Sequence, residues 1–462
     1  MNLTLFWSIF ILFGGSYFTV AMLASRRIAT TDDYFLAGRQ LGIFSITFTL
    51  IASQLGAGMM LGTTDEAFHY GIYGLLYNLG ICLGFLLLGL GFAAKLRQFN
   101  ISTTAELFQL KYNSILLRRL ASILSVITLG GILAGQILAS RKLIGTFTTD
   151  HNWLLTLFWL AVIFYTMFGG LKAAVATDIF QFFLILAVFG ATGAFIWSGQ
   201  KSYPISSLHD VATLQSQYFA LENMSWSKMT GFLLMPICFS LIEQDLAQRF
   251  FSAKTKKIAV LSALLAGIFI LCFSFVPLFL GMQAKILNLS LGYKASVLLS
   301  SVQFLAGDVL LVFVICALVA AIGSTADSLL CAIGSNIVYD FNLSTAQHAA
   351  YPYGILISRT VTFVAGVSAL CAAYFFDSIL GIIIQSYEIS VSCLFIPLLF
   401  CYLKKKVYKE AAVAAFACGL FGFIAFRLFP MSMPREIATL ILSLTGYIAG
   451  HLWAKMLAKQ KV

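Results

Sequence analysis

Residues 320–328 read AAIGSTADS and interrupt an apolar run that extends from Val309 to about Val338. Polar side chains are costly in hydrocarbon, so they normally face a helix-bundle interior or an aqueous path and are candidates for function. Ser324 and Thr325 supply hard oxygen donors, and oxygen donors without cysteine or histidine suit an alkali or other hard cation. The alternative is that both hydroxyls bond to carbonyls of their own helix, as membrane serines and threonines often do.

The composition of the chain places this stretch in a membrane protein. The 462 residues are 60% hydrophobic and 10% charged, and apolar runs of roughly 18 or more residues recur throughout. We therefore expect an all-α polytopic membrane protein with about 13 transmembrane helices. The expected spans are residues 3–24, 42–66, 72–94, 120–146, 152–169, 174–198, 229–248, 258–283, 305–338, 353–375, 379–402, 410–429 and 436–454.

The distribution of basic residues predicts the orientation of these spans. With the N-terminus outside and the C-terminus inside, most of the 29 lysines and arginines fall in cytoplasmic loops. These residues are short clusters between spans, so the net charge of +11 does not indicate a nucleic-acid partner. The nine cysteines lie in apolar runs without a CxxC pair, and we expect neither disulfides nor a metal site from them.

The second expected span is not a uniform helix. Residues 52–58 read ASQLGAG, with two glycines and two polar side chains at mid-depth. Unwound backbone is tolerated in a membrane only where it lines a cavity, although close packing through small residues is an alternative. Spans two to six and seven to eleven could form two five-helix halves of opposite orientation, and an interrupted first helix in one half indicates a binding site at the midplane of the membrane.

The predicted regions are a leading helix and loop at 1–41, a first half at 42–198, an external loop at 199–228, a second half at 229–403 and two trailing helices at 404–462.

Several charged or amide side chains lie within or near the ends of other spans. Asp178 and Gln181 are one turn apart on one face of a helix, where capping near the interface is the alternative to a functional role. Asp245 and Arg249 are four residues apart and are expected to pair at the cytoplasmic end. Glu388 is expected to need a structural partner rather than to contact a solute.

Four blocks, taken together with the interrupted second span, resemble the sodium:solute symporter family. This group includes the sodium/proline, sodium/pantothenate, sodium/sialic-acid and sodium/glucose symporters. The blocks are DYFLAGR at 33–39, Thr177-Asp178 with Gln181, Gln248-Arg249 with 252–254, and 324–328. The resemblance covers nearly the whole chain, and it implies a LeuT-like five-plus-five inverted repeat that works by alternating access.

The resemblance also implies sodium sites. The main sodium would be held by the backbone carbonyls of Ala52, Leu55 and Ala321 and by the hydroxyls of Ser324 and Thr325. A second sodium, or an exit path for the first, would involve Asp178, Asp327 and Ser328. The chain departs from the family at Asp327, where sialic-acid transporters have serine, and at Gly56, where many members have serine.

The solute pocket implied by the resemblance is lined by Gln54, Gly58, Gln136, Phe239, Ser240 and Tyr387. Pro236 stands where sugar-transporting members place polar contacts, which favours a small amino-acid-like or carboxylate solute over a sugar.

We therefore expect a sodium-coupled symporter in the plasma (inner) membrane, with sodium as the coupling ion, and acting as a monomer that imports a small organic solute. Two alternatives share this fold. A proton-coupled transporter would use Asp178, Asp327 or Glu388 as the proton carrier, and a membrane sensor would bind the solute without moving it. An enzyme is disfavoured because the chain contains no HExxH motif and no convincing pair of nucleophile and base.

Overall fold

The computed structural model describes residues 3–25, 28, 30–145, 152–198, 224–287, 289, 296–341, 353–376, 378–404, 406–429 and 432–460. These residues are almost entirely helical and contain no strand, only one isolated bridge between Leu41 and Ala253. The predicted external loop at 199–228 lies mostly outside the described residues, which resume at 224.

The helical elements follow one another with short connections. In chain order they are α1 (Leu3–Ser25), α2 (Thr31–Leu36), η1 (Ala37–Arg39), α3 (Ile43–Gln54), η2 (Gly58–Gly62), α4 (Thr63–Tyr70), η3 (Gly71–Leu75), α5 (Leu76–Leu87), η4 (Leu88–Phe92), α6 (Ala93–Phe99), α7 (Glu106–Tyr112), α8 (Ile115–Ile144), α9 (Asn152–Trp197), α11 (Trp226–Ser240), α12 (Gln244–Phe251), α13 (Lys256–Ile286), α14 (Val297–Asp340), α15 (Tyr353–Ala372), η7 (Ala373–Phe375), α16 (Ile379–Ser390), η8 (Val391–Phe395), α17 (Ile396–Leu403), α18 (Lys409–Leu428) and α19 (Arg435–Gln460).

The helices are long and apolar enough for a membrane protein. Within the described part of the chain, ten helical runs have the length and hydropathy to cross a bilayer, and α3 and the described part of α1 are shorter apolar helices. The expectation of an all-α polytopic membrane protein is therefore supported. The number of spans and the orientation of the termini stay predictions.

A glycine divides the 46-residue helix α9. At 1.5 Å per residue this helix is about 69 Å long, more than twice the roughly 30 Å hydrocarbon core. Gly170 has φ +50°, and a Cβ there would lie 2.5 Å from the carbonyl oxygen of Tyr34, so only glycine fits. The kink falls between the two spans expected at 152–169 and 174–198.

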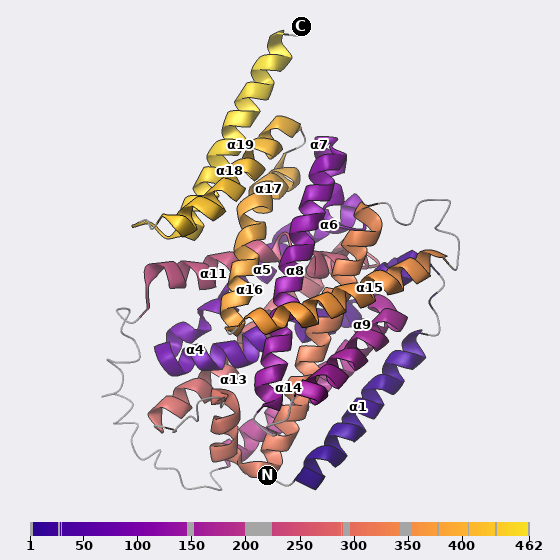
Figure 1. The fold of residues 1–462 in the computed structure, drawn as a ribbon, viewed down its shortest axis with the longest axis vertical. Coiled ribbons are helices and arrows are strands. Elements are labelled where there is room, and N and C mark those ends of the chain that lie inside the picture. Colours follow the sequence, from indigo (N-terminus) through magenta and orange to yellow (C-terminus); the bar gives the residue numbers. More distant parts are fainter. Residues whose placement is uncertain are drawn as a thin grey trace.

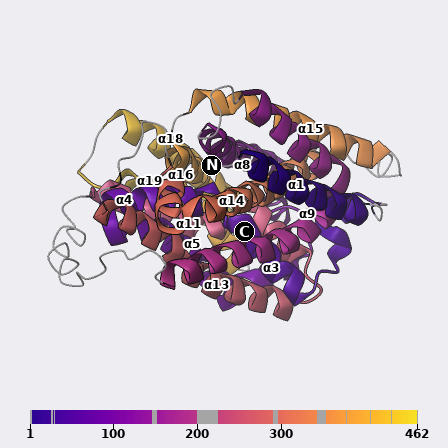
Figure 2. The same ribbon diagram turned by 90° about the horizontal axis from the view of Figure 1, so that it is seen from below.

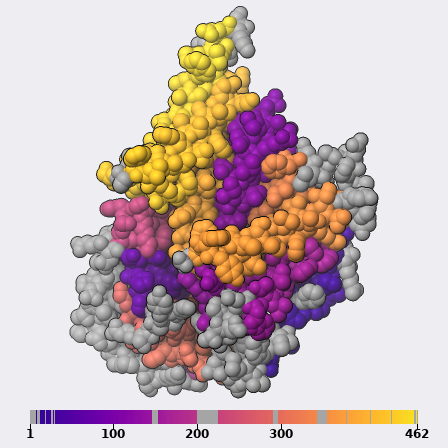
Figure 3. Space-filling view, in the orientation of Figure 1, coloured from indigo at the N-terminus to yellow at the C-terminus, as the bar shows by residue number. Residues whose placement is uncertain are grey.

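Helix α14 runs through the middle of the bundle. It packs against α8, α9, α13 and α15 and also contacts α1 and α3 (Figures 1 and 2). Helices α18 and α19 lie side by side at the C-terminal end, where the space-filling view shows their yellow surface projecting from the bundle (Figure 3). The polar residues of α14 therefore face other helices at the centre of the fold.

Candidate functional site

The helix that contains α3 is interrupted where the sequence predicted. The last backbone hydrogen bond of α3 runs from Leu55 N to Ile51 O (3.0 Å), and the next runs from Met60 N to Gly56 O (3.1 Å). Within this fully described stretch, the four carbonyls of residues 52–55 accept no i+4 backbone bond. Freed carbonyls in a buried site need another partner, and a cation can be one.

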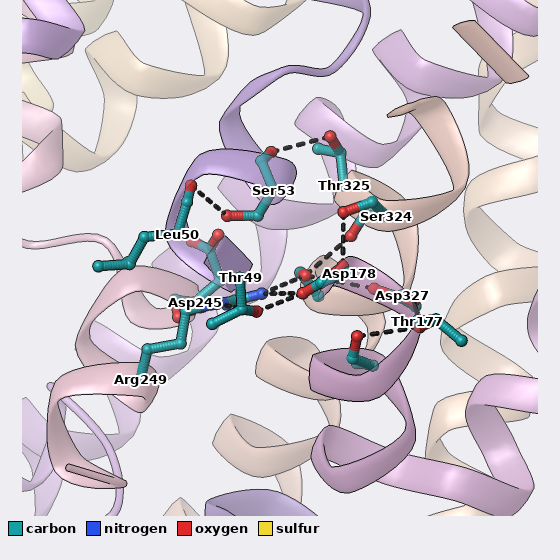
Figure 4. A network of polar contacts seen from close by, with 12 residues as sticks. Thr49, Leu50, Ser53, Thr177, Asp178, Asp245, Arg249, Ser324, Thr325 and Asp327 are labelled. Carbon is teal, nitrogen blue, oxygen red and sulfur yellow. Dashed lines mark hydrogen bonds and ion pairs between the residues drawn. The ribbon is translucent and has the colours of Figure 1, made fainter. Parts of the chain in front are cut away.

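Helix α14 presents hydroxyls to this interruption. The Thr325 Oγ1 atom lies 2.8 Å from the carbonyl oxygen of Ser53 and 3.1 Å from that of Ala321 (Figure 4). Ser324 Oγ donates to Asp178 Oδ1 at 2.5 Å, and its side chain is fully buried. The two hydroxyls therefore face α3 and α9 rather than lipid, and the alternative that both bond only to their own helix does not hold.

Gly56 explains how the two helices approach so closely. A Cβ at this position would lie 2.4 Å from Thr325 Oγ1 and 3.0 Å from Gln136 Oε1. The Gln136 amide oxygen accepts a hydrogen bond from Ala57 N at 2.9 Å, which satisfies one of the first amides beyond the break. Glycine at position 56 therefore leaves room for the Thr325 hydroxyl.

Below this level, a buried arginine joins the site. The Arg249 guanidinium forms an ion pair with Asp178 (Nη2 to Oδ2, 3.4 Å), and both side chains are fully buried. It also donates to Thr49 Oγ1 (3.0 Å), to the hydroxyl of Ser328 and to the backbone oxygen of Asp245 (2.8 Å) (Figure 4). The expected pair between the Arg249 and Asp245 side chains is therefore wrong. The tertiary carboxylate on α9 takes the guanidinium, and Asp245 contributes only its carbonyl.

Asp327 sits among hydroxyl groups. Its Oδ2 atom accepts from Tyr165 (3.1 Å), Tyr17 (3.3 Å) and Thr177 (3.5 Å), and Oδ1 accepts from Ser328 (3.2 Å). The carboxylate is fully buried, and no ion pair to it is found among the described residues. Hydroxyl donors alone thus satisfy this carboxylate.

The residues predicted to line a solute pocket are partly brought together. The rings of Phe239 and Tyr387 stack with centroids 4.2 Å apart, and Tyr77 OH lies 3.2 Å from Tyr387 OH. A Cβ at Gly58 would lie 3.0 Å from that Tyr77 hydroxyl, which places the start of η2 beside the aromatic rings. Gln54 ends α3 next to the break.

Ser240 follows Phe239 at the end of α11, but its side chain faces α5. Its Oγ donates to Pro236 O at 2.8 Å, and its side chain fills the space above Gly84, where a Cβ would lie 2.5 Å from Oγ. Helix α11 ends at this residue, and α12 begins only at Gln244. A role for Ser240 in the solute pocket stays a prediction.

Glu388 has the structural partners that its depth requires. Its carboxylate is 1% exposed and pairs with Arg427 at 2.7 Å and with Arg435 at 3.4 Å. The prediction of a structural pair is confirmed.

Sequence reasoning missed Thr49, Tyr17, Tyr165 and Tyr77. Each is a hydroxyl side chain inside an apolar run, and a single such residue gives too weak a pattern to stand out. Only the tertiary contacts with Asp178, Asp327 and Tyr387 reveal their place in the site.

The model of the sodium:solute symporter family matches residues 34–419. The chain belongs to the sodium:solute symporter family. This family consists of transporters rather than enzymes, and its members are multi-pass membrane proteins.

The proteins to which this chain is similar are named for different solutes. The chain is 26% identical to the sodium/iodide cotransporter of Homo sapiens over 52% of its length and 39% of that protein. It is 27% identical to the sodium/pantothenate symporter of Escherichia coli (strain K12), over 49% of each chain. It thus spans no more than about half the length of these two relatives. Identity to the high-affinity choline transporter 1 of Drosophila melanogaster is 24%, over 92% of this chain and 74% of that one.

Solved structures support the fold of this chain. A sodium-coupled sialic acid symporter in a substrate-bound outward-open state aligns with a TM-score of 0.80, at 16% identity, over 97% of this chain and 98% of that one. A nucleobase-cation-symport-1 family transporter in a closed conformation aligns with a TM-score of 0.61, at 14% identity, over 91% and 94%. At these identities the likeness concerns the fold alone.

Proposed function

We propose that this chain is a sodium-coupled symporter that imports a small organic solute by alternating access. The observation that carries the proposal is the interruption at residues 52–55, where the released carbonyl of Ser53 accepts a hydrogen bond from the Thr325 hydroxyl of α14. One ion at this position would link two helices that belong to different halves of the predicted repeat, and a transporter can couple such a link to its conformational change.

The proposed sodium ligands are the backbone oxygens of Ala52, Leu55 and Ala321 and the hydroxyls of Ser324 and Thr325. All five residues are buried, and the oxygens of Ala321 and Thr325 already lie 3.1 Å apart. Neutral oxygens suit a weakly hydrated alkali cation better than a divalent ion, which normally takes several carboxylates.

Sodium binding would drive uptake through linkage. An ion that bridges α3 and α14 stabilises the conformation in which both sides of the bridge are in place. Because the solute site adjoins the same break, sodium raises solute affinity, and the solute must raise sodium affinity by the same factor. Each inward positive charge gains about 2.3 kcal/mol per 100 mV of membrane potential.

We propose a solute pocket at Gln54, Gly58, Gln136, Phe239 and Tyr387. The helical run that starts at Gly58 directs its N-terminal amides toward the break, and half-helix N-termini in transporters of this fold favour anionic groups of the solute. The stacked rings of Phe239 and Tyr387 supply an apolar wall. We therefore favour an amino-acid-like or carboxylate solute. The relatives are named for iodide, pantothenate and choline, so they do not fix the choice.

A thermal-shift screen of the purified protein against small solutes, in NaCl and in KCl, tests this proposal. We expect a ligand that raises the melting temperature only with sodium, and uptake of that ligand into liposomes only under an inward sodium gradient. Equal stabilisation in both salts would contradict sodium coupling.

One observation favours a second candidate function, proton-coupled transport. Asp327 is a fully buried carboxylate held only by hydroxyls, so it is the strongest proton carrier among the three considered. Asp178 and Glu388 are both in ion pairs with arginine. Uptake that follows a pH gradient and ignores sodium would select this candidate.

A further inference from the structure

A crevice in the side of the bundle lies apart from the proposed sodium and solute sites. It has a volume of about 720 Å³ and is lined by residues of α8, α14, α15, α16 and α18. Helix α8 packs against both α15 and α16, and Figure 3 shows its purple surface beside their orange surface. Pockets that hold ligands typically measure about 300–1,000 Å³. The crevice is therefore large enough for a ligand.

The walls of the crevice are mostly apolar and open toward the membrane. Ile333 of α14 and Ile382 of α16 are buried in it, whereas Ile127 of α8 and Val364 of α15 are 53% and 55% exposed. On α15 the lining runs from residue 360 to residue 372, a length of about 18 Å at 1.5 Å per residue. One leaflet contributes roughly half of the 30 Å hydrocarbon core. The crevice thus matches the length of an acyl chain from one leaflet.

Gly130 of α8 shows that neighbouring side chains do not fill the crevice. A Cβ at this position would meet no atom within 4 Å, although the residue lines the crevice. At the next residue, Gly131, a Cβ would clash with Ser386 Oγ, so α8 and α16 touch there. A larger side chain at position 130 would therefore enter the crevice without a clash against the neighbouring helices.

Three side chains of the crevice have hydrogen-bond donors to spare. Gln385 and Ser368 are exposed, and neither side chain has a hydrogen-bond partner in the described part of the chain. Arg427 carries five N–H donors, of which only Nη2 has a partner among the described residues, Glu388 at 2.7 Å. Gln385 lies three residues before Glu388, so its amide is on the same side of α16 as that ion pair. Polar groups without partners are costly in hydrocarbon, so these donors require acceptor oxygens from an occupant.

We propose that the crevice binds a glycerophospholipid of the surrounding bilayer. Its phosphate and ester oxygens accept hydrogen bonds from Arg427, Gln385 and Ser368, and one acyl chain lies along α8 and α15. Guanidinium groups suit phosphate, and the chain removes the apolar walls from water. A plain hydrocarbon chain would leave the donors without acceptors, and water would leave the walls wet. The inference goes beyond the proposed function, because it needs neither sodium nor solute.

Native mass spectrometry of the delipidated protein, titrated with palmitoyl-oleoyl phosphatidylglycerol, tests the inference. We expect one tightly bound lipid per wild-type chain. Gly130→Leu should lower the lipid affinity about tenfold or more, because the leucine takes the place of the acyl chain. Gly190→Leu is the matched control on α9, since a Cβ there also meets nothing within 4 Å, and it should bind the lipid like the wild type.

Two further measurements examine the polar end of the crevice. Gln385→Leu removes one donor and should weaken phosphatidylglycerol binding about twofold to tenfold. Palmitoyl-oleoyl glycerol has the same chains without the phosphate, so it should bind the wild type about tenfold more weakly or worse, because it lacks the charge-assisted bond to Arg427.

Several results would overturn the inference. These are equal lipid affinity in Gly130→Leu and Gly190→Leu, equal binding of the two lipids, or many weakly bound lipids with no single tight one. A dimer of the delipidated wild type that Gly130→Leu dissociates would instead assign the crevice to a second copy of this chain. If Gly130→Leu is not monodisperse, Gln385→Leu decides, because its exposed side chain holds no other part of the described fold, and an unchanged affinity would reject the lipid site. Binding of ²²Na⁺ to Gly130→Leu should equal that of the wild type, so failure here leaves the proposed function untouched.

Discussion

Replacement of Gly56 by alanine tests the contact between the interrupted helix and α14. The new Cβ would lie 2.4 Å from Thr325 Oγ1, whereas ordinary van der Waals contacts begin at 3.4 Å, so the hydroxyl must move by roughly 1 Å. That displacement breaks the 2.8 Å contact between Thr325 and Ser53 O. The net value of such a hydrogen bond is about 0.5–1.5 kcal/mol, so we expect sodium affinity to fall by about twofold to tenfold.

The assay is ²²Na⁺ binding to Gly56→Ala, with Gly190→Ala as the matched control. A Cβ at Gly190 meets nothing within 4 Å, so that variant should bind sodium like the wild type. In a Thr325→Ala background the clashing hydroxyl is absent, so Gly56→Ala should lower sodium affinity little further. A double-mutant cycle would then show strong coupling between the two positions. Unchanged sodium affinity in Gly56→Ala, or purely additive effects of the two substitutions, would refute the reasoning.

Three further predictions follow from other contacts. Glu388→Gln should lower the stability of the folded protein by about 1–3 kcal/mol, because Arg427 loses a charged partner. A thermal melt in NaCl measures this loss of stability. Sodium binding should stay intact, and its loss would argue against a purely structural role for Glu388. Phe239→Ala should weaken solute affinity by about tenfold or more, because it removes the ring stacked on Tyr387. Binding of ²²Na⁺ should stay unchanged. A thermal-shift titration that gives the same solute affinity as for the wild type would show that Phe239 is not part of the pocket. Asp327→Asn should retain sodium-driven uptake. If this variant instead stops uptake, and the wild type shows uptake that depends on pH, the result would support the proton-coupled candidate.

The membrane class and the centre of the site were predictable from local sequence. Hydropathy alone marks the helices, and polar residues stand out because the surrounding hydrocarbon makes them costly. The glycines and the amide side chain near Leu55 are likewise unusual at mid-membrane, and they predicted the interruption of the helix that the backbone hydrogen bonds confirm. Both signals depend only on residues close in the chain.

The partners of charged residues were not predictable in this way. For Arg249, the four-residue spacing favoured Asp245, but Asp178, 71 positions away in sequence, forms the ion pair. Glu388 was expected to need a partner, yet nothing in its neighbourhood indicated Arg427 or Arg435. Such pairs depend on which helices pack together, and helical spacing carries no information about that.

The central claim is that sodium links the interruption of α3 to the hydroxyls of α14 and thereby builds the solute site. The most direct test is the dissociation constant of the identified solute, measured in NaCl and in KCl, for the wild type and for Thr325→Ala. We predict tighter binding in sodium for the wild type and a much smaller difference between the salts for Thr325→Ala. The same affinity in both salts for the wild type, or an unchanged sodium effect in Thr325→Ala, would contradict the account.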